Sequence, residues 1–184
     1  MENAELVPDV LDREPTSLLR VEFGPKKVQL GNKLTIQEVS EAPTLVDWDA
    51  EKGKFYSLCF TDPDAPSRST PTVREWVHWL VVNIPGDSKD ISKGDTLIEF
   101  VPSCPGENSG IHRYTFVLHQ QPSHLDFSAV QRFDKSVEHR ALRRHFSIRT
   151  FAQRFSFGEA LAGNFYTTEW DDYVSVIRKQ LGLE

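Results

Sequence analysis

Apolar and polar positions alternate most clearly in residues His112–Gln120, where Tyr114, Phe116 and Leu118 occupy every second position. Successive side chains of a β-strand point to opposite faces, so a period of two places these three on one face. Many of the other apolar runs are short and bounded by glycine or proline, which is typical of strands. The pattern therefore predicts a strand over His112–Gln120 within a chain built mainly from short strands.

Two further runs, Phe55–Thr61 and Trp76–Ile84, are apolar at most positions. Such runs are typical of strands buried on both faces, so both are predicted to lie centrally in a sheet. Shorter strands are predicted at Leu18–Phe23, Thr35–Val39, Leu45–Asp47, Leu97–Val101 and Phe165–Tyr166.

Helical signals lie at the two ends of the chain. A short helix is predicted at Val7–Asp12, and one or two short helices at Val137–Arg154. Thr168–Asp171 resembles a capping box with Asp in its fourth position, and it predicts a helix over Glu169–Leu181 that ends at Gly182.

These elements predict a mostly β protein, an antiparallel sandwich flanked by two to four helices, including one at the C-terminus. The 184 residues contain no repeat or linker, which favours one domain over residues 1–184. Two cysteines are too few for a disulfide framework. Cys59 is predicted to be a buried small hydrophobe and Cys104 a loop residue.

The net charge of −6 argues against a nucleic-acid partner. One basic cluster interrupts this acidic balance, and it is interpreted as a solvated face. Its members are Arg140, Arg143, Arg144, Arg149 and Arg154. The first residues resemble no signal peptide, and no apolar run is long enough to span a membrane, so a soluble cytoplasmic protein is expected.

A first candidate site begins where a predicted central strand ends. Asp62 and Asp64 follow that strand and are separated by Pro63, while Pro66 stiffens the same loop. A rigid loop at a strand end holds side chains with little entropy left to lose on binding. His78 lies on the next long strand and is predicted to join these carboxylates.

A second candidate site is the Pro/Gly-rich loop from Val101 to Ile111, which feeds the strand that contains His112 and Tyr114. Small residues let a ligand approach the backbone, whose N–H groups can hold an anion. Histidine and tyrosine can both donate hydrogen bonds to a phosphate group. A nearby carboxylate either orients a histidine or accepts from an ammonium on the same ligand, as in phosphoethanolamine.

With these residues the chain resembles the phosphatidylethanolamine-binding protein family, which includes the Raf kinase inhibitor proteins. The resemblance extends from about Leu18 to the C-terminus, and His78 lies at the family's spacing after the Asp-Pro-Asp loop. The segments that carry it are Asp62–Ser67 with His78, Gly110–Tyr114 and Glu169–Tyr173.

The resemblance implies a Greek-key β-sandwich with a small anion pocket at one end. Family members bind phospholipid head groups, including phosphatidylethanolamine, and nucleotides, and some regulate kinases or inhibit serine proteases. It thus implies a monomeric binding protein, with no catalytic residue, metal or cofactor and at most peripheral membrane contact. The predicted ligand-binding residues, including those of the loop, are Asp62, Trp76, His78, Ser103, Gly106, Gly110, His112 and Tyr114. The predicted supporting residues are Pro63, Asp64, Pro66 and Tyr173.

The chain departs from the family pattern at the rim of this pocket. Pro102–Gly106 stands where the family has Gly-x-Gly-Pro-Pro, and Val73 replaces an aromatic residue that many animal members carry. Proline in place of the first glycine removes backbone freedom and one N–H donor. The fold is expected to tolerate these changes, whereas affinity and selectivity for the ligand are expected to differ.

Two alternative functions stay open. Asp62, Asp64, His78 and His112 are residue types that could hold a divalent metal in a phosphohydrolase, although no Gly-x-Ser-x-Gly or Walker motif accompanies them. The chain could instead be a scaffold with a degenerate pocket, which docks a kinase or protease through the acidic N-terminus or the segment Arg140–Arg154.

Overall fold

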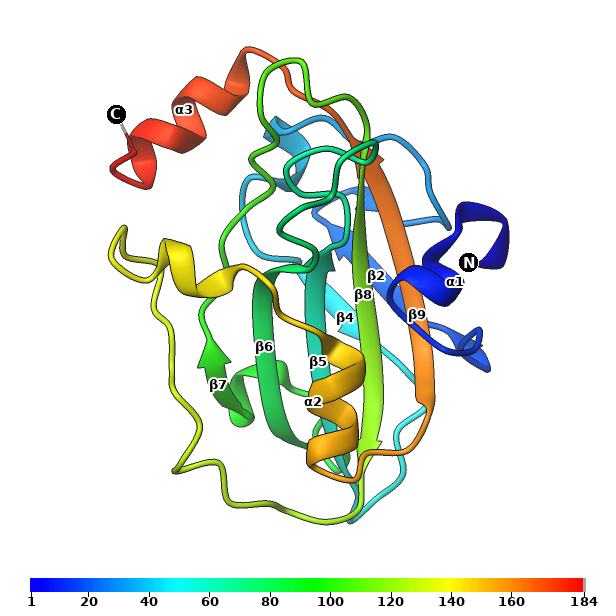
Figure 1. Cartoon of the computed structure of the whole chain (residues 1–184). Helices are drawn as coiled ribbons and strands as arrows, with labels where there is room; N and C mark the ends of the chain where they lie inside the picture. The colour runs from blue at the N-terminus through cyan, green and yellow to red at the C-terminus, as the bar shows by residue number, and fades with distance from the viewer. Residues whose placement is uncertain (184) are drawn as a thin grey trace.

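The computed structural model describes residues 1–183 and arranges their strands in two sheets (Figure 1). The larger sheet has the order β1-β9-β8-β5-β6-β7, and the smaller has the order β3-β2-β4. Strand β1 runs parallel to β9, whereas the other pairs are antiparallel. The strands are β1 (Ser17–Leu18), β2 (Arg20–Phe23), β3 (Lys26–Lys27), β4 (Leu45–Asp47), β5 (Phe55–Asp62), β6 (Trp76–Pro85), β7 (Asp95–Ile98), β8 (His112–Gln121) and β9 (Ala160–Thr168).

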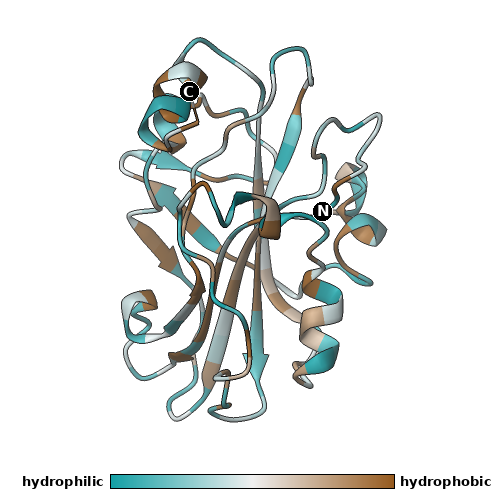
Figure 2. Cartoon of the chain, turned by 60° about the vertical axis from the view of Figure 1, so that its left-hand side comes forward, coloured by the Kyte–Doolittle hydropathy of each residue, from teal (hydrophilic) through white to brown (hydrophobic). Residues whose placement is uncertain are grey.

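The two sheets pack against each other through aromatic side chains. Phe23 of β2 meets Phe116 of β8 and Tyr166 of β9, with ring centroids 6.2 and 5.7 Å apart. Hydrophobic segments follow the strands of both layers (Figure 2). The predicted face of Tyr114, Phe116 and Leu118 belongs to this core. The predicted mostly β fold class is therefore confirmed.

The opposite face of the larger sheet is covered by helical segments. Val117 and other residues of this face form a second core cluster with Leu6 of α1 and Ile148 of α2. In Figure 1, α2 lies across the central strands. None of the described helices is long and apolar enough to cross a bilayer. The helices are α1 (Leu6–Asp9), α2 (Ile148–Arg154) and α3 (Tyr173–Gln180), with 3-10 turns η1 (Glu2–Ala4), η2 (Gln37–Val39), η3 (Ile91–Lys93) and η4 (Arg140–Arg143).

The predicted strand at Thr35–Val39 is wrong, because this segment contains the 3-10 turn η2. The backbone N–H of Thr35 donates to the Glu38 carboxylate, and the N–H of Glu38 donates to the Thr35 hydroxyl. This reciprocal pair is a capping box, which satisfies two N–H groups that a strand would have paired with a neighbour. Thr35-x-x-Glu38 was a helix-start signal in the sequence.

The C-terminal helix begins at Tyr173, four residues later than predicted, because Thr168 still belongs to β9. Asp171 closes the turn before the helix by accepting from the N–H of Tyr173, and its other oxygen accepts from the N–H of Ile36. The capping carboxylate thus also anchors the helix to the turn at η2.

Smaller differences concern boundaries. The predicted strand Leu18–Phe23 is divided between the two sheets, and the predicted Leu97–Val101 lies earlier, at β7. The N-terminal helix starts at Leu6 and ends at Asp9 instead of Asp12. The two predicted residues of the last strand extend to nine, β9. Pairing with a neighbouring strand sets these ends, and the pattern of a single segment does not contain that information.

Candidate functional site

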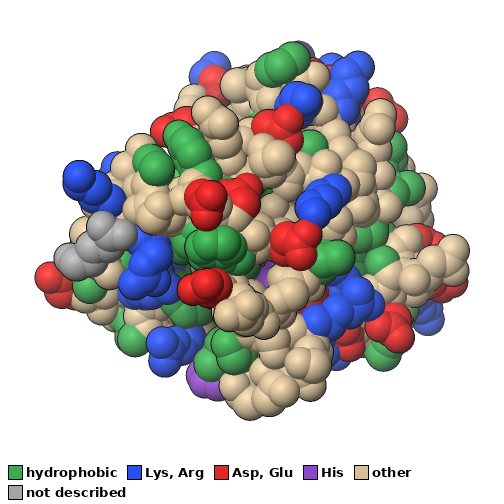
Figure 3. Space-filling model, turned by 90° about the horizontal axis from the view of Figure 1, so that it is seen from above, with side chains coloured by type: hydrophobic (Ala, Val, Ile, Leu, Met, Phe, Trp, Pro, Cys, Tyr) green, Lys and Arg blue, Asp and Glu red, His purple; other side chains and the backbone are tan. Residues whose placement is uncertain are grey.

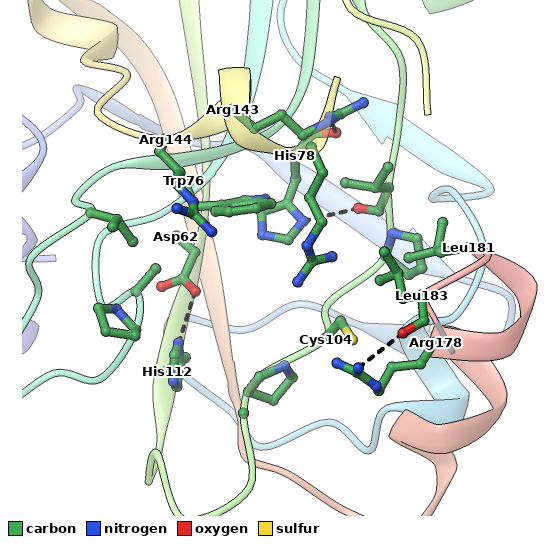
Figure 4. Close-up of a pocket in the computed structure, with 18 of the residues that line it drawn as sticks. Asp62, Trp76, His78, Cys104, His112, Arg143, Arg144, Arg178, Leu181 and Leu183 are labelled. Carbon is green, nitrogen blue, oxygen red and sulfur yellow. Dashed lines mark hydrogen bonds and ion pairs between the residues drawn. The ribbon is translucent and has the colours of Figure 1, made fainter. Parts of the chain in front are cut away.

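A cavity of about 420 Å³ opens at the end of the sandwich where β5 ends and β6 and β8 begin. Its walls are the loop after β5, the loop before β8, the segment around η4, and the end of α3 (Figure 4). The volume is in the range of small-molecule sites. The strand ends supply rigid positions, whereas η4 and α3 come from distant parts of the chain.

Asp62 and His112 form a buried pair in the wall of this cavity. Asp62 Oδ2 lies 2.8 Å from His112 Nδ1, and Asp62 Oδ1 accepts from the N–H of Asp64 at 2.7 Å. Burial raises the pKa of Asp62 despite the partners that stabilise its charge. Burial lowers the pKa of His112, but the hydrogen bond and charge of Asp62 outweigh it, so the net pKa is raised. The carboxylate therefore orients this histidine and favours its protonated form.

His78 lies beside this pair but has a different electrostatic environment. Burial, reinforced by the charges of Arg143 and Arg140, lowers the pKa of His78 to about 3. The neutral ring therefore donates from Nδ1 to the carbonyl of Val101 at 3.0 Å. Its Nε2 is then an acceptor, suited to a ligand hydroxyl or to a protonated phosphate oxygen.

Arginine side chains from the segment around η4 form a second wall. Arg140 and Arg144 lie over the Trp76 ring, with guanidinium carbons 5.1 and 5.9 Å from its centroid. Arg143 is buried and donates to the carbonyls of Val77, His78 and Asp134. Burial lowers the pKa of Arg143 to about 10, which still leaves it charged at neutral pH.

Two more cations complete the cavity wall, Lys135 before η4 and Arg178 on α3. Arg178 donates to the carbonyl of Leu183 at 3.1 Å (Figure 4). Over residues 1–183, none of the five cations in the wall forms an ion pair with a carboxylate. Asp62 is the one acidic side chain among the described residues that line the cavity. Figure 3, which looks down on this end, shows Lys and Arg side chains on several parts of the surface, with Asp and Glu side chains among them.

The structure brings most of the predicted site residues together. The predicted ligand-binding residues that line the cavity are Asp62, Trp76, His78, Gly106, His112 and Tyr114, and the supporting residue Pro66 joins them. Val73 and Cys104, which mark the departure from the family pattern, also lie in the wall. Burial raises the pKa of Tyr114 well above its ordinary value, so its phenol remains a donor at neutral pH.

Five other predicted residues lie outside the lining. Ser103 is buried with its hydroxyl 2.6 Å from that of Tyr166, and Gly110 is exposed with φ +77°, which suits glycine. Tyr173 packs against the small cluster around Ile36. These three therefore shape the structure around the cavity.

Asp64 and Pro63 act through arginine side chains instead. Both carboxylate oxygens of Asp64 accept from Arg113, whose side chain is 1% exposed. The carbonyl of Pro63 accepts from Arg74 at 2.6 Å. The Asx turn of this loop is made by Asp62, whose Oδ1 accepts from the N–H of Asp64.

The sequence pattern does not predict the cationic wall. The interpretation of the arginine cluster as a solvated face fits the exposed Arg154. Arg140, Arg143 and Arg144 instead face the cavity, together with Lys135 and Arg178, which lie outside that cluster. The one signal was the spacing of Arg140, Arg143 and Arg144, which a short helical turn places close together.

The four residues considered as metal ligands do not form such a site. Over residues 1–183, no group of three or more His, Cys, Asp or Glu side chains is arranged to hold a metal ion. The Asp64 carboxylate is bound to Arg113, and Asp62 is bound to His112. The arrangement of these donors thus favours anion binding over cation binding.

The fold and this cavity define a β-sandwich protein with a cationic, ligand-sized pocket at one end. Residues 24–166 match the sequence model of the phosphatidylethanolamine-binding protein family. A Drosophila melanogaster protein named "Putative odorant-binding protein A5" is 36% identical over 98% of this chain and 84% of its own length. The chain belongs to the phosphatidylethanolamine-binding protein family, and the resemblance found in the sequence is confirmed.

Solved structures show the same fold. The solution structure of CG7054 is 37% identical, covers 96% of this chain and 97% of its own, and has a TM-score of 0.75. The carboxypeptidase Y inhibitor, complexed with its cognate proteinase, is 22% identical and has a TM-score of 0.73. The match covers 92% of this chain and 93% of the inhibitor chain. The phosphatidylethanolamine-binding protein from Plasmodium vivax is 21% identical with a TM-score of 0.71, over 92% of this chain and 95% of that one.

Proposed function

We propose that this chain is a binding protein for small phosphorylated ligands, including phospholipid head groups, which it holds in the cavity between the strand ends, η4 and α3. The observation that carries this proposal is the wall of five cations without a carboxylate partner over residues 1–183. Guanidinium groups donate to phosphate oxygens in a fixed fork geometry, which gives both charge and direction.

The neutral groups of the cavity complement these cations. His78 Nε2 accepts from a ligand hydroxyl, and Tyr114 can donate to a phosphate oxygen. Asp62 holds His112 in place and raises its pKa, so this carboxylate favours a positive charge next to the ligand. Docking of a kinase or serine protease stays a prediction of the family resemblance.

Backbone-amide NMR titration with inorganic phosphate tests the proposal. We expect saturable shifts at Asp62, His78, His112 and the loop from Ser103 to Gly110, and about tenfold weaker binding in Arg140→Gln, since a charge-assisted hydrogen bond is lost. Arg154→Gln is the matched control, because Arg154 belongs to the same basic segment but lies outside the cavity lining.

Two results would contradict the proposal. One is the absence of saturable shifts at millimolar phosphate. The other is equal weakening in Arg140→Gln and Arg154→Gln, which would indicate a diffuse effect of surface charge. An Asp62→Asn variant tests the role of the carboxylate separately, because the amide oxygen can still accept from His112 but lacks the negative charge that raises the pKa of His112.

A further inference from the structure

The cavity has a larger positive charge than one phosphate group neutralises. Five cations line it, whereas a phosphomonoester bears a charge of about −1.5 to −2 at neutral pH. This excess of positive charge affects the pKa of Arg140. Burial lowers that pKa, and the nearby charges of Arg178 and Arg144 lower it further. Like charges gathered without a counter-charge are unfavourable, so an anion that reaches several of them relieves the repulsion.

The cations enter the cavity from two walls. The guanidinium groups of Arg140 and Arg144 lie over Trp76, which pairs across the strands with Asp62. Arg178 enters from α3, on the other wall. The volume of about 420 Å³ exceeds what a single phosphate group fills.

The described lining of the cavity contains few groups that could bind a ligand ammonium. Asp62 is the one carboxylate of the described lining, and both of its oxygens already accept hydrogen bonds, from His112 and from the N–H of Asp64. A zwitterionic head group such as phosphoethanolamine would therefore place its ammonium in a positive field without a free carboxylate. The cavity favours ligands whose second polar group is also an anion.

We propose that the preferred ligand is a compact molecule with two or more phosphate groups, one held by Arg140 and Arg144 over Trp76 and another held by Arg178 on α3. This inference rests on the proposed function and specifies its class of ligand. The phosphates can belong to a soluble metabolite or to a phosphorylated lipid head group, since the charges in the cavity recognise both.

Isothermal titration calorimetry at one ionic strength compares two matched pairs, 3-phosphoglycerate with 2,3-bisphosphoglycerate and inositol 1-phosphate with inositol 1,4,5-trisphosphate. We expect each multiply phosphorylated probe to bind at least about tenfold more tightly than its monophosphate partner. Arg178→Gln is expected to weaken the multiply phosphorylated probes more than their monophosphate partners and so to remove most of this difference. Lys179→Gln, one residue later on α3 and outside the lining, is expected to keep it.

The possible outcomes separate this inference from the proposed function. Equal affinities within each pair would overturn the inference and leave the proposed function standing, whereas no binding of any probe would overturn both. Tighter binding of phosphoethanolamine than of the bisphosphate would also overturn it. Sedimentation with vesicles that contain phosphatidylinositol 4,5-bisphosphate, with and without competing inositol 1,4,5-trisphosphate, distinguishes a lipid source from a soluble one. Amide spectra of both variants check their folding.

Discussion

Buried ionisable side chains near the cavity differ in the hydrogen-bond partners of their polar atoms. Asp62 has a charged partner, and Arg143 donates to three carbonyl groups. Glu75, just before β6, is 4% exposed and accepts from the N–H of Ile148, while its other oxygen has no partner over residues 1–183. Burial raises the pKa of Glu75 to about 8, so this side chain is mostly protonated at neutral pH.

Glu75 makes the stability of the fold depend on pH. Its pKa is about 8 in the folded protein, against an ordinary value of 4.5 for a solvated glutamate, so the folded protein binds the proton more tightly than the unfolded chain. The stability from this group is fully present below pH 4.5 and decreases by up to about 1.4 kcal/mol per pH unit as the pH rises toward 8. Replacement of Glu75 by Gln removes the ionisation, and we expect this part of the decrease to disappear.

Urea denaturation of both proteins at several pH values between about 5 and 9 measures this effect. The wild-type free energy of unfolding is expected to fall relative to that of Glu75→Gln across this range. Parallel pH profiles for the two proteins would show that Glu75 ionises normally in the folded state.

At the scale of elements, one buried arginine connects the N-terminal segment to the sandwich. Arg113 of β8 donates to Asp64 in the loop after β5, to Asp9 of α1 and to the carbonyl of Ala4. These bonds hold the first helix against the sheet, next to the loop that follows Asp62. The loop and the N-terminal segment are therefore stabilised together.

Arg113→Ala is expected to destabilise the protein by about 3–5 kcal/mol, because the buried Asp64 carboxylate loses its nearest cation and the two hydrogen bonds from that side chain. The N–H groups of Val10 and Leu11 are expected to exchange faster with solvent. Arg68→Ala is the control, since Arg68 also donates to Ala4 but is exposed and paired with the exposed Glu5. Its expected cost is under about 1 kcal/mol, and a similar loss in both variants would contradict this account.

At the scale of the whole molecule, the cavity is assembled from segments that are far apart in the chain. Trp76 and Arg140 lie 5.1 Å apart, between ring centroid and guanidinium carbon, although 63 residues separate them in the sequence. A ligand that contacts all of these segments stabilises the folded state, because the unfolded chain has no such site.

Thermal unfolding with increasing phosphate measures this linkage. At a ligand concentration about 100 times the Kd, binding adds about 2.7 kcal/mol, which raises the Tm of a domain of this size by several degrees. The double variant Arg140→Gln and Arg144→Gln is expected to lose most of this increase. Phosphate also stabilises proteins without binding, and the double variant measures that part. Equal increases in both proteins would contradict a specific site.

The sequence by itself determined the strands whose signal is local. The period of two in β8 and the apolar runs of β5 and β6 predicted these strands within one residue of their observed ends. The Asp-Pro-Asp loop and the residues near His112 identified the family and one wall of the cavity. Alternation and turn chemistry depend on neighbouring residues, so a single sequence contains this information.

The tertiary structure alone decided which charged side chains face the cavity. Arg140 and Arg154 look alike in the sequence, but one lies over Trp76 and the other is exposed. The sequence motif predicted Asp64 as a residue that supports the site. In the folded protein its carboxylate instead accepts hydrogen bonds from Arg113. The direction of a long side chain depends on which distant segment packs against it, and that packing is decided only when the whole chain has folded.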